Sequence, residues 1–274
     1  MLIVGERINT SRKVKGEPII ENAVRARDAA YFIDLAKKQV EAGANYIDVN
    51  AGTLLEGEPD AIEWLVTTIQ GALDIPCAID SPNPVAIERA LKVHKGQAMI
   101  NSITAEAVRY KNVLPLVKEY DTKVIALSMG DAGIPPDAEG RISVARELIG
   151  NLVSAGIKLD NIYADPLVFP IANGMEYGIA VLDTIRTIKA EFPGIHASAG
   201  VSNVSHGMPA RKFLNQAFTV MCMTAGLDAA IVDPMDKQLM ALVYATEALL
   251  GRDEYCAEYI SASREGRLEP LAEK

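Results

Sequence analysis

Short β-rich runs alternate along this chain with longer segments of helical periodicity, and this alternation constrains the fold more than any other feature. The pattern predicts strands at residues 2–5, 46–49, 77–79, 98–100, 123–127, 162–164, 196–201 and 229–232. It predicts helices between them, among others at residues 29–42, 58–73, 85–94, 141–155, 176–191, 210–225 and 237–249. Gly43, Gly156 and Gly226 follow three of these helical segments, where a left-handed C-terminal cap favours glycine.

Eight strands that are each followed by a helix predict an α/β protein with one closed (β/α)8 barrel. The length of 274 residues is typical of such a barrel, and no linker-like or low-complexity stretch divides the chain. We therefore expect a single domain over residues 1–274. An open, doubly wound sheet is the alternative, but no GxGxxG motif follows the first strand, which argues against its dinucleotide-binding form.

The charge and the cysteines exclude several classes of protein. The formal net charge is −9 and no local basic patch is present, so we expect no nucleic-acid partner. No apolar stretch is long enough to cross a bilayer, and charged residues interrupt the N-terminus too early for a signal peptide. The three cysteines are far apart, which favours a reducing cytoplasm over a disulfide framework or a cysteine-based zinc site.

Polar residues stand where the expected strands end. They are Glu6, Asp48, Asn50, Asp80, Ser81, Asn101, Ser102, Ser128, Asp165, Ser202, Asn203 and Asp233. In a barrel these ends converge on one mouth, where barrel enzymes place their active sites. Helix capping is the alternative explanation. It suffices for Ser81 or Ser102 taken singly, but it is weaker for the whole set, because apolar residues precede nearly every member.

The residue types at this mouth favour a particular kind of ligand. A carboxylate accepts two parallel hydrogen bonds from an amino group and a neighbouring ring N–H. An amide donates to a ring nitrogen and accepts from an amino group. A mouth rich in Asp and Asn therefore favours a pterin-like or purine-like heterocycle, and a sugar is the alternative.

Other chemistries find little support in the sequence. The histidines show no metal-binding spacing, so we expect no bound metal. We expect His94 on a helix surface, His196 in a structural role within a strand, and His206 in a loop that reaches the mouth. No GxSxG or P-loop motif is present, and Cys77 is expected in the core. The turn-rich segment 130–140 is interpreted as a surface loop rather than a lid.

At these same residues the chain resembles a known family, the pterin-binding methyltransferases that move a methyl group between methyltetrahydrofolate and a corrinoid protein. The matching stretches are LIVGERIN at 2–9, DVNAG at 48–52, AIDS at 78–81, MINSI at 99–103, ADPL at 164–167, GVSNVSHG at 200–207 and GLDAAIVDP at 226–234. They run through nearly the whole chain in barrel order. The family includes enzymes of acetogen-type anaerobes and is related to the folate domain of cobalamin-dependent methionine synthase and to dihydropteroate synthase.

The resemblance implies a pterin-binding TIM barrel and roles for individual residues. Asp80, Asn101 and Asp165 would bind the edge of the pterin, and Asn203 would be the catalytic residue that hydrogen-bonds the pterin nitrogen carrying the methyl group. Five further positions lie in matching stretches with less defined roles: Glu6, Asp48, Ser202, His206 and Arg211. His206 departs from the family pattern, which has an amide side chain there.

The resemblance also implies the reactants and partners of a cytoplasmic methyltransferase. Tetrahydrofolate or its methyl derivative would be the substrate, and a separate corrinoid protein would bring the cobalt, because the chain contains no DxHxxG cobalamin motif. A homodimer is expected from the family alone. The residues would suit either direction of transfer, so both acetogenesis and demethylation of methoxyarenes or methylamines stay open as pathways.

Two other functions remain as alternatives. A dihydropteroate synthase would need a basic pyrophosphate site and a lysine near the end of the seventh strand, where this chain instead reads SNVSHG. A non-catalytic folate-binding module would keep the pterin residues and have no need of Asn203.

Overall fold

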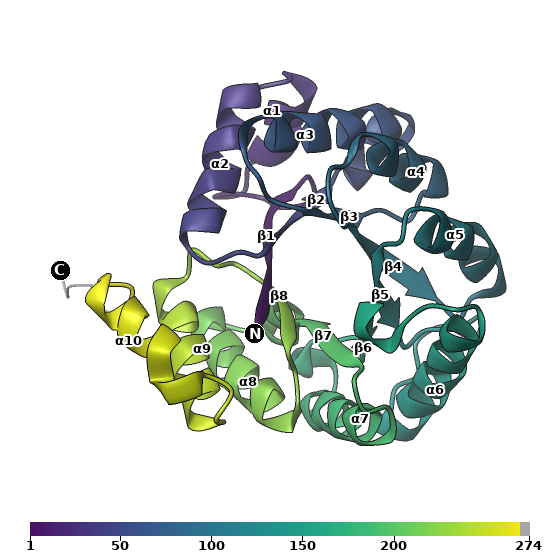
Figure 1. Cartoon of the computed structure of the whole chain (residues 1–274), viewed down its shortest axis with the longest axis vertical. Helices are drawn as coiled ribbons and strands as arrows, with labels where there is room; N and C mark the ends of the chain where they lie inside the picture. The colour runs from purple at the N-terminus through teal and green to yellow at the C-terminus, as the bar shows by residue number, and fades with distance from the viewer. Residues whose placement is uncertain (269–274) are drawn as a thin grey trace.

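Eight parallel strands occupy β1 (Leu2–Asn9), β2 (Tyr46–Asn50), β3 (Cys77–Asp80), β4 (Met99–Thr104), β5 (Lys123–Leu127), β6 (Ile162–Asp165), β7 (His196–Gly200) and β8 (Ala229–Val232). They close into a barrel in chain order, because β8 pairs with β1 as well as with β7. Figure 1 shows the ring of helices outside these strands. The computed structural model describes residues 1–268. The predicted (β/α)8 barrel is confirmed.

The helices are α1 (Ile19–Arg25), α2 (Ala29–Glu41), α3 (Glu58–Ala72), α4 (Pro84–Val93), α5 (Ala107–Glu119), α6 (Ala138–Ser154), α7 (Tyr177–Glu191), α8 (Arg211–Ala225), α9 (Lys237–Leu249) and α10 (Ala257–Arg264). Short 3-10 turns include η1 (Gly52–Gly57), η3 (Ile171–Asn173) and η4 (Val201–Ser205). Within residues 1–268, no helix is long and apolar enough to cross a membrane.

The helices form because their apolar residues recur at helical spacing, and α2, α4, α6 and α9 are also capped by a side chain at their first turn. In α3, Ala61, Leu65 and Ile69 recur every four residues and are fully buried against the sheet. The Asp28 carboxylate caps α2 by accepting a hydrogen bond from the amide of Tyr31 at 3.0 Å.

Two strands end four residues later than the sequence pattern predicts, whereas β2, β3 and β6 end one residue later. β1 continues from the expected end at residue 5 to residue 9, because Ile8 and Asn9 still pair with β2 after an irregular step in register. β4 likewise continues to residue 104 along β5. As a result Glu6, Asn101 and Ser102 lie inside strands rather than after them.

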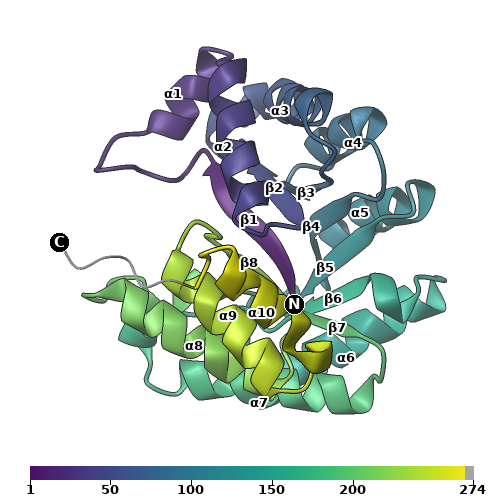
Figure 2. The ribbon, with the colours of Figure 1, turned by 60° about the vertical axis from the view of Figure 1, so that its left-hand side comes forward.

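Three helices fall outside the predicted ranges. α5 runs straight through Pro115, a residue that weakens any sequence-based expectation of a helix at this place. α1 is a single short helix ahead of α2, and α10 follows α9 on the outside of the ring, as Figure 2 shows.

Side chains fill the interior of the barrel near the N-terminal ends of the strands, so this part is a packed core and not a pore. These interior residues come from seven of the eight strands: Val4, Tyr46, Ala78, Met99, Ile125, Tyr163 and Ala229. They lie near the start of their strands, which leaves open space only toward the C-terminal ends.

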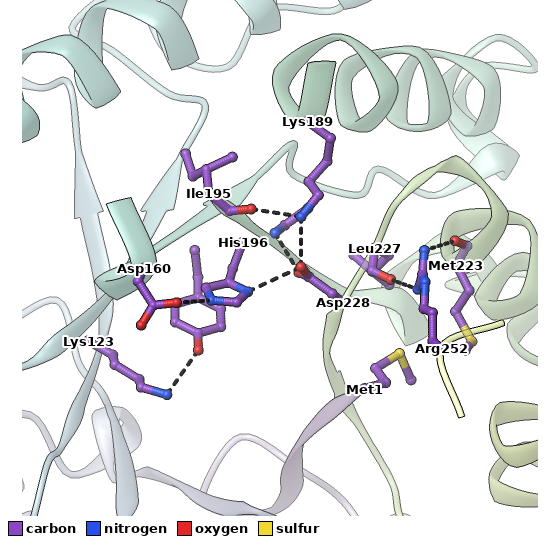
Figure 3. Close-up of polar contacts among 12 residues, drawn as sticks. Met1, Lys123, Asp160, Lys189, Ile195, His196, Met223, Leu227, Asp228 and Arg252 are labelled. Atoms are coloured by element: carbon purple, nitrogen blue, oxygen red, sulfur yellow. Dashed lines mark hydrogen bonds and ion pairs between the residues drawn. The ribbon is translucent and has the colours of Figure 1, made fainter. Parts of the chain in front are cut away.

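A polar network lies at the opposite, N-terminal end of the strands (Figure 3). Asp228 accepts hydrogen bonds from Lys189 Nζ at 2.7 Å and from the amide of Ala197 at 2.8 Å, and its carboxylate lies 3.1 Å from His196 Nδ1. Burial opposes ionisation of Asp228, but these three contacts together lower its pKa. The hydrogen bond with Asp228 raises the pKa of His196. His196 thus has the structural role that was predicted.

His94 does not lie freely on a helix surface, as the sequence suggested. It follows the last residue of α4 and is half-buried, and its Nε2 accepts a hydrogen bond from the amide of Cys77 at 2.9 Å. This contact satisfies the first amide of β3 and ties the end of α4 to the sheet. Burial lowers the pKa of His94. Cys77 is fully buried, as predicted.

Candidate active site

A cavity of about 770 Å³ lies at the C-terminal ends of the strands. It brings together all nine residues to which the family resemblance gives a place in the site: Glu6, Asp48, Asp80, Asn101, Asp165, Ser202, Asn203, His206 and Arg211. Of the other polar residues at the strand ends, Asp233 also lines the cavity, and Asn50, Ser81, Ser102 and Ser128 do not. The nine residues come from five strands and from the segment after β7, so only closure of the barrel places them in one cavity. Their positions are thereby established, whereas their roles stay predictions.

On one side of the cavity, two carboxylates and two amides from β2, β3 and β4 form two hydrogen-bonded pairs, one between neighbouring strands and one across β3. Asn101 Nδ2 on β4 donates to Asp48 Oδ1 on β2 at 3.2 Å. Asn50 Nδ2 on β2 donates to Asp80 Oδ2 on β3 at 3.0 Å. Asn50 also accepts a hydrogen bond from the amide of Gly52 at 3.0 Å, which fixes its orientation. The amides therefore hold both carboxylates in place while leaving oxygen lone pairs available for a ligand.

Burial and mutual repulsion make these carboxylates reluctant to ionise. Burial raises the pKa of Asp48 well above its ordinary value, the negative charge of Asp80 adds to the effect, and the hydrogen bond from Asn101 partly offsets it. Burial raises the pKa of Asp80 to about 6, against the opposing influence of Asn50 and Arg109. A ligand that donates hydrogen bonds here would stabilise the charged forms of both groups.

Asp165 occupies the end of β6, and only 4% of it is exposed. Its Oδ1 accepts a hydrogen bond from the amide of Leu167 at 2.8 Å. Burial raises the pKa of Asp165 to about 7, and this amide and the charge of Arg141 partly counteract the effect. Asp165 is thus a third buried carboxyl group that faces the cavity.

The opposite side of the cavity, formed by β1 and the segment after β7, carries hydroxyl and cationic groups. Ser202 Oγ donates to Glu6 Oε2 at 3.1 Å, and Arg12 Nη1 lies 3.7 Å from Glu6 Oε1. Burial raises the pKa of Glu6, although Arg12 and Ser202 oppose the shift. Arg211 donates to the Ser202 carbonyl and to Ser205 Oγ, both at 2.9 Å, and so holds the turn η4 against α8.

Asn203, His206 and Arg211 differ from the other site residues in being exposed. The Asn203 side chain makes no hydrogen bond with another residue in the described part of the chain, and it lies over Gly200, where an added Cβ would come within 3.1 Å of Nδ2. Its amide is therefore able to meet a ligand. Partial burial and the nearby charge of Arg211 lower the pKa of His206.

The sequence analysis missed several residues that also line the cavity. They are Asn9, Ser11, Arg12, Lys13, Lys212, Asn215 and Asp236. The signal was present for Asn9, because GERIN continues the first strand, but Glu6 and Arg7 interrupt the apolar pattern. Arg12 and Lys13 follow that strand and enter the site only because β1 is longer than predicted.

The arrangement separates two kinds of chemistry within one cavity. Buried carboxyl groups and Asn101 line the side from β2 to β6, where they suit amino and ring N–H donors. Asn203, His206 and Arg211 line the side after β7, close to open solvent. One end of a flat heterocycle would thus be held firmly, while its far edge would remain accessible to a second reactant.

Comparison with known proteins agrees with this geometry. The model of a family described as pterin binding enzyme matches residues 6–233. A methylcorrinoid:tetrahydrofolate methyltransferase of Eubacterium limosum is 33% identical over 276 residues, covering all of both chains. A methionine synthase of Mycobacterium leprae is 30% identical over 244 residues, which cover 85% of this chain and 20% of that protein.

The solved structures that are similar to this chain support the fold. A dihydropteroate synthase from Clostridium difficile aligns with a TM-score of 0.66 and 24% identity, over 90% of this chain and 96% of that one. A Yersinia pestis dihydropteroate synthase aligns with a TM-score of 0.68 and 15% identity, over 90% and 94%. Together with the match over most of the chain, the barrel and its cavity show that this protein belongs to the pterin-binding enzyme family.

Proposed function

We propose that this protein is a methyltransferase that moves a methyl group between methyltetrahydrofolate and the cobalt of a corrinoid carried by a separate protein. The observation that carries the proposal is the group of carboxyl and amide side chains in the cavity, of which Asp48 and Asp165 are buried, in a chain similar along its whole length to a methylcorrinoid:tetrahydrofolate methyltransferase. The substrate, the partner and the residue roles below are parts of this proposal.

Asp80, Asn101 and Asp165 are proposed to bind the pterin edge. The amino group and adjacent ring N–H of a pterin present parallel donors, and a carboxylate accepts both. Binding such a donor pair gives the carboxylate hydrogen-bond partners beyond those that the protein itself supplies, which favours the charged form over the neutral one. Asp48 supports Asn101 through the 3.2 Å hydrogen bond between them.

Asn203 is proposed as the catalytic residue. When the N–CH3 bond of methyltetrahydrofolate breaks, the pterin nitrogen keeps the bonding electron pair and takes up a proton from solvent. Cobalt(I) of the corrinoid supplies the pair for the new bond to carbon, and becomes formally cobalt(III). A strong acid in the site would also protonate cobalt(I), so a neutral amide suits this step. Its hydrogen bond to the nitrogen stabilises the charge that develops in the transition state.

The rim of the cavity supports a large second reactant. Exposed apolar residues stand in the segments that follow the strands, on the same face as the cavity: Leu55, Val85, Val108, Met175 and Phe213. Between 55% and 92% of each is exposed. Apolar residues gathered around a polar cavity are typical of a surface that receives a protein partner, here the corrinoid protein.

The setting and the assembly also belong to the proposal. We place the protein in the reducing cytoplasm of an anaerobe, a setting that suits cobalt(I) chemistry and the three cysteines, all of which are unpaired in the described chain. A homodimer is favoured by apolar residues on the outer helices, namely Ile179, Met221, Leu242 and Leu249.

The experiment that tests the proposal offers the purified protein each alternative reaction separately. With methyltetrahydrofolate and free cob(I)alamin under anaerobic conditions, we expect the visible spectrum of methylcobalamin to appear. With a pterin pyrophosphate and 4-aminobenzoate, we expect no dihydropteroate. Formation of dihydropteroate would favour the synthase, and binding of methyltetrahydrofolate without transfer would favour a non-catalytic folate module.

A further inference from the structure

Arg141 is a fully buried arginine that none of the site residues contacts directly. It lies in the first turns of α6, and its exposed fraction is 0%. Its guanidinium donates to the carbonyls of Pro135 and Leu167 at 3.0 Å each, and more weakly to that of Pro136 at 3.4 Å. No carboxylate lies within ion-pair distance of it among residues 1–268.

Two aromatic rings lie close to this guanidinium. Its central carbon lies 5.0 Å from the ring centroid of Phe169 and 5.9 Å from that of Tyr177. Removing a positive charge from water is costly, and carbonyl oxygens and aromatic faces only partly replace the hydration that is lost. Accordingly, burial lowers the pKa of Arg141. Burying the Arg141 charge without a carboxylate partner costs free energy, which indicates that this residue does more than fill space in the core.

Leu167 connects Arg141 to the cavity. Its backbone adopts φ +59°, in the left-handed region that a leucine rarely occupies. Hydrogen bonds hold it from both sides, since its amide donates to Asp165 Oδ1 at 2.8 Å and its carbonyl accepts from Arg141. Without the arginine, this residue would be free to relax toward an ordinary conformation, and its amide would leave the Asp165 carboxylate.

We propose that Arg141 is a positioning residue that fixes the turn at Leu167 and thereby holds the Asp165 carboxyl group in the cavity in its binding orientation and charged form. The inference rests on the proposed function only in taking a pterin as the ligand. Arg141 also ties the segment 130–140 to the same turn through Pro135 and Pro136. The segment 130–140, which was expected to be a surface loop, is thus anchored through Arg141 to the turn that follows β6.

The charge of Arg141 acts on Asp165 in a definite direction. It lowers the pKa of Asp165, against the larger effect of burial. Among the groups around this pair, Cys222 on α8 lies near Asp165, and burial keeps its thiol neutral by raising its pKa. Tyr177 on α7 and Asp137, which precedes α6, act on Arg141. Replacing Arg141 by a neutral residue therefore moves the titration of Asp165 to higher pH.

The test titrates the Asp165 carboxyl carbon by 13C NMR in the ligand-free protein, with Asp165→Asn to assign the signal. We expect Arg141→Met to raise the Asp165 midpoint by roughly 0.5–1 pH unit. Arg141→Lys keeps a charge but lacks the planar fork that holds the Leu167 carbonyl, so we expect the midpoint to rise by less than in Arg141→Met, because only the Leu167 amide contact is weakened. Arg146→Gln is the control, because Arg146 lies on the same helix and pairs with Glu191 at the surface.

Calorimetric binding of methyltetrahydrofolate supplies the second readout. At pH 8.5 we expect Arg141→Lys to weaken binding about tenfold, because the Leu167 turn loosens, and Arg146→Gln to bind like the wild type. If Arg141→Met does not fold, the lysine variant alone decides. An unmoved Asp165 midpoint in Arg141→Met, or wild-type affinity in Arg141→Lys, would overturn the inference. A wild-type protein that binds no methyltetrahydrofolate would instead contradict the proposed function and leave the NMR result standing.

Discussion

The folding stability of the protein favours the neutral form of the buried Asp165 carboxyl group, whereas the proposed binding of a pterin favours its charged form. Burial raises its pKa from an ordinary 3.8 to about 7 in the folded protein, so the folded state holds a proton that the unfolded state has released between these values. Stability therefore falls as the pH rises from about 4 to about 7 and stays lower above it. The difference in pKa corresponds to at most about 4 kcal/mol.

Asp165→Asn should consequently stabilise the ligand-free protein while weakening ligand binding. The Asn oxygen still accepts from the Leu167 amide, but no charge remains to be buried. We expect a higher free energy of urea unfolding than wild type at pH 8 and little difference at pH 4. Methyltetrahydrofolate affinity should fall by roughly 2–5 kcal/mol, measured by calorimetry. Unchanged affinity would show that the pterin lies elsewhere.

Asn203 should separate catalysis from binding. Its contact with the pterin nitrogen is expected to strengthen as charge develops there, so Asn203→Ala should lower kcat by roughly ten- to a thousandfold. Affinity should fall less, because the carboxylates and Asn101 still hold the ring. Single-turnover transfer measured beside equilibrium binding checks this. Equal losses in both would make Asn203 an ordinary binding residue, and an unchanged rate would direct attention to His206.

For individual residues, the sequence could predict the polar side chains that stand at the strand ends. It could not predict a side chain that acts by hydrogen-bonding the backbone of distant segments. Asp80 and Asp165 follow apolar runs, and that pattern survives in a single sequence. Arg141 looks like any polar residue of a helix, because its partners are carbonyls of Pro135 and Leu167, whose positions depend on the folded loops.

At the level of the elements, the type and order of strands and helices could be predicted, but several boundaries could not. Glu6 and Arg7 interrupt the apolar pattern of β1, yet the strand continues because its backbone still pairs with β2. Pro115 likewise argues against a helix at the place of α5. The helix forms nevertheless, because the packing of Val113 and Val117 outweighs the loss of the backbone hydrogen bond that a proline cannot donate.

The network at the N-terminal ends of β7 and β8 should support stability without affecting the site. Asp228→Ala removes the partner of Lys189, of His196 and of the Ala197 amide, so we expect a loss of about 2–3 kcal/mol in the free energy of unfolding. Methyltetrahydrofolate affinity should not change, because the network lies at the other end of the barrel from the cavity.

The pH dependence of this loss has a definite sign. The pKa of His196 is raised in the folded state, so its contribution is complete below the unfolded value of 6.5 and is lost as the pH rises through the folded value. The gap between wild type and Asp228→Ala should therefore narrow from pH 6 to pH 9. Asp183→Ala, which breaks a surface pair with Arg186, is the control and should cost less than about 1 kcal/mol. A loss of equal size in both variants would contradict the account.

For the whole molecule, closure of the barrel is the property that the local pattern could not encode. Each β/α unit can be recognised in the sequence, but the same units in an open sheet would give the same sequence pattern. The pairing of β1 with β8 distinguishes the closed barrel from the open sheet. The number of strands and the resemblance to a barrel family favoured closure, and the closed barrel brings Glu6, Asp80 and Asp165 to one cavity. The surface that is proposed to receive the corrinoid protein leaves no comparable pattern in the sequence.

Assembly is tested directly by the mass of the protein in solution. If the apolar outer residues of α7, α8 and α9 form a symmetric contact, sedimentation equilibrium at micromolar concentrations should give twice the mass of one chain. Met221→Glu, on the outer face of α8 and 47% exposed, should shift the equilibrium toward the monomer. A monomeric mass for the wild type at every concentration would exclude the dimer.

The most direct test of the central claim is anaerobic transfer of a labelled methyl group from methyltetrahydrofolate to cob(I)alamin by the purified protein. We expect labelled methylcobalamin to form in proportion to time and protein with the wild type and with Arg146→Gln. Asp165→Asn should give almost none at the same substrate concentration. Wild-type protein that binds methyltetrahydrofolate yet forms no labelled methylcobalamin, or Asp165→Asn that transfers at the wild-type rate, would contradict the claim that this cavity transfers methyl groups.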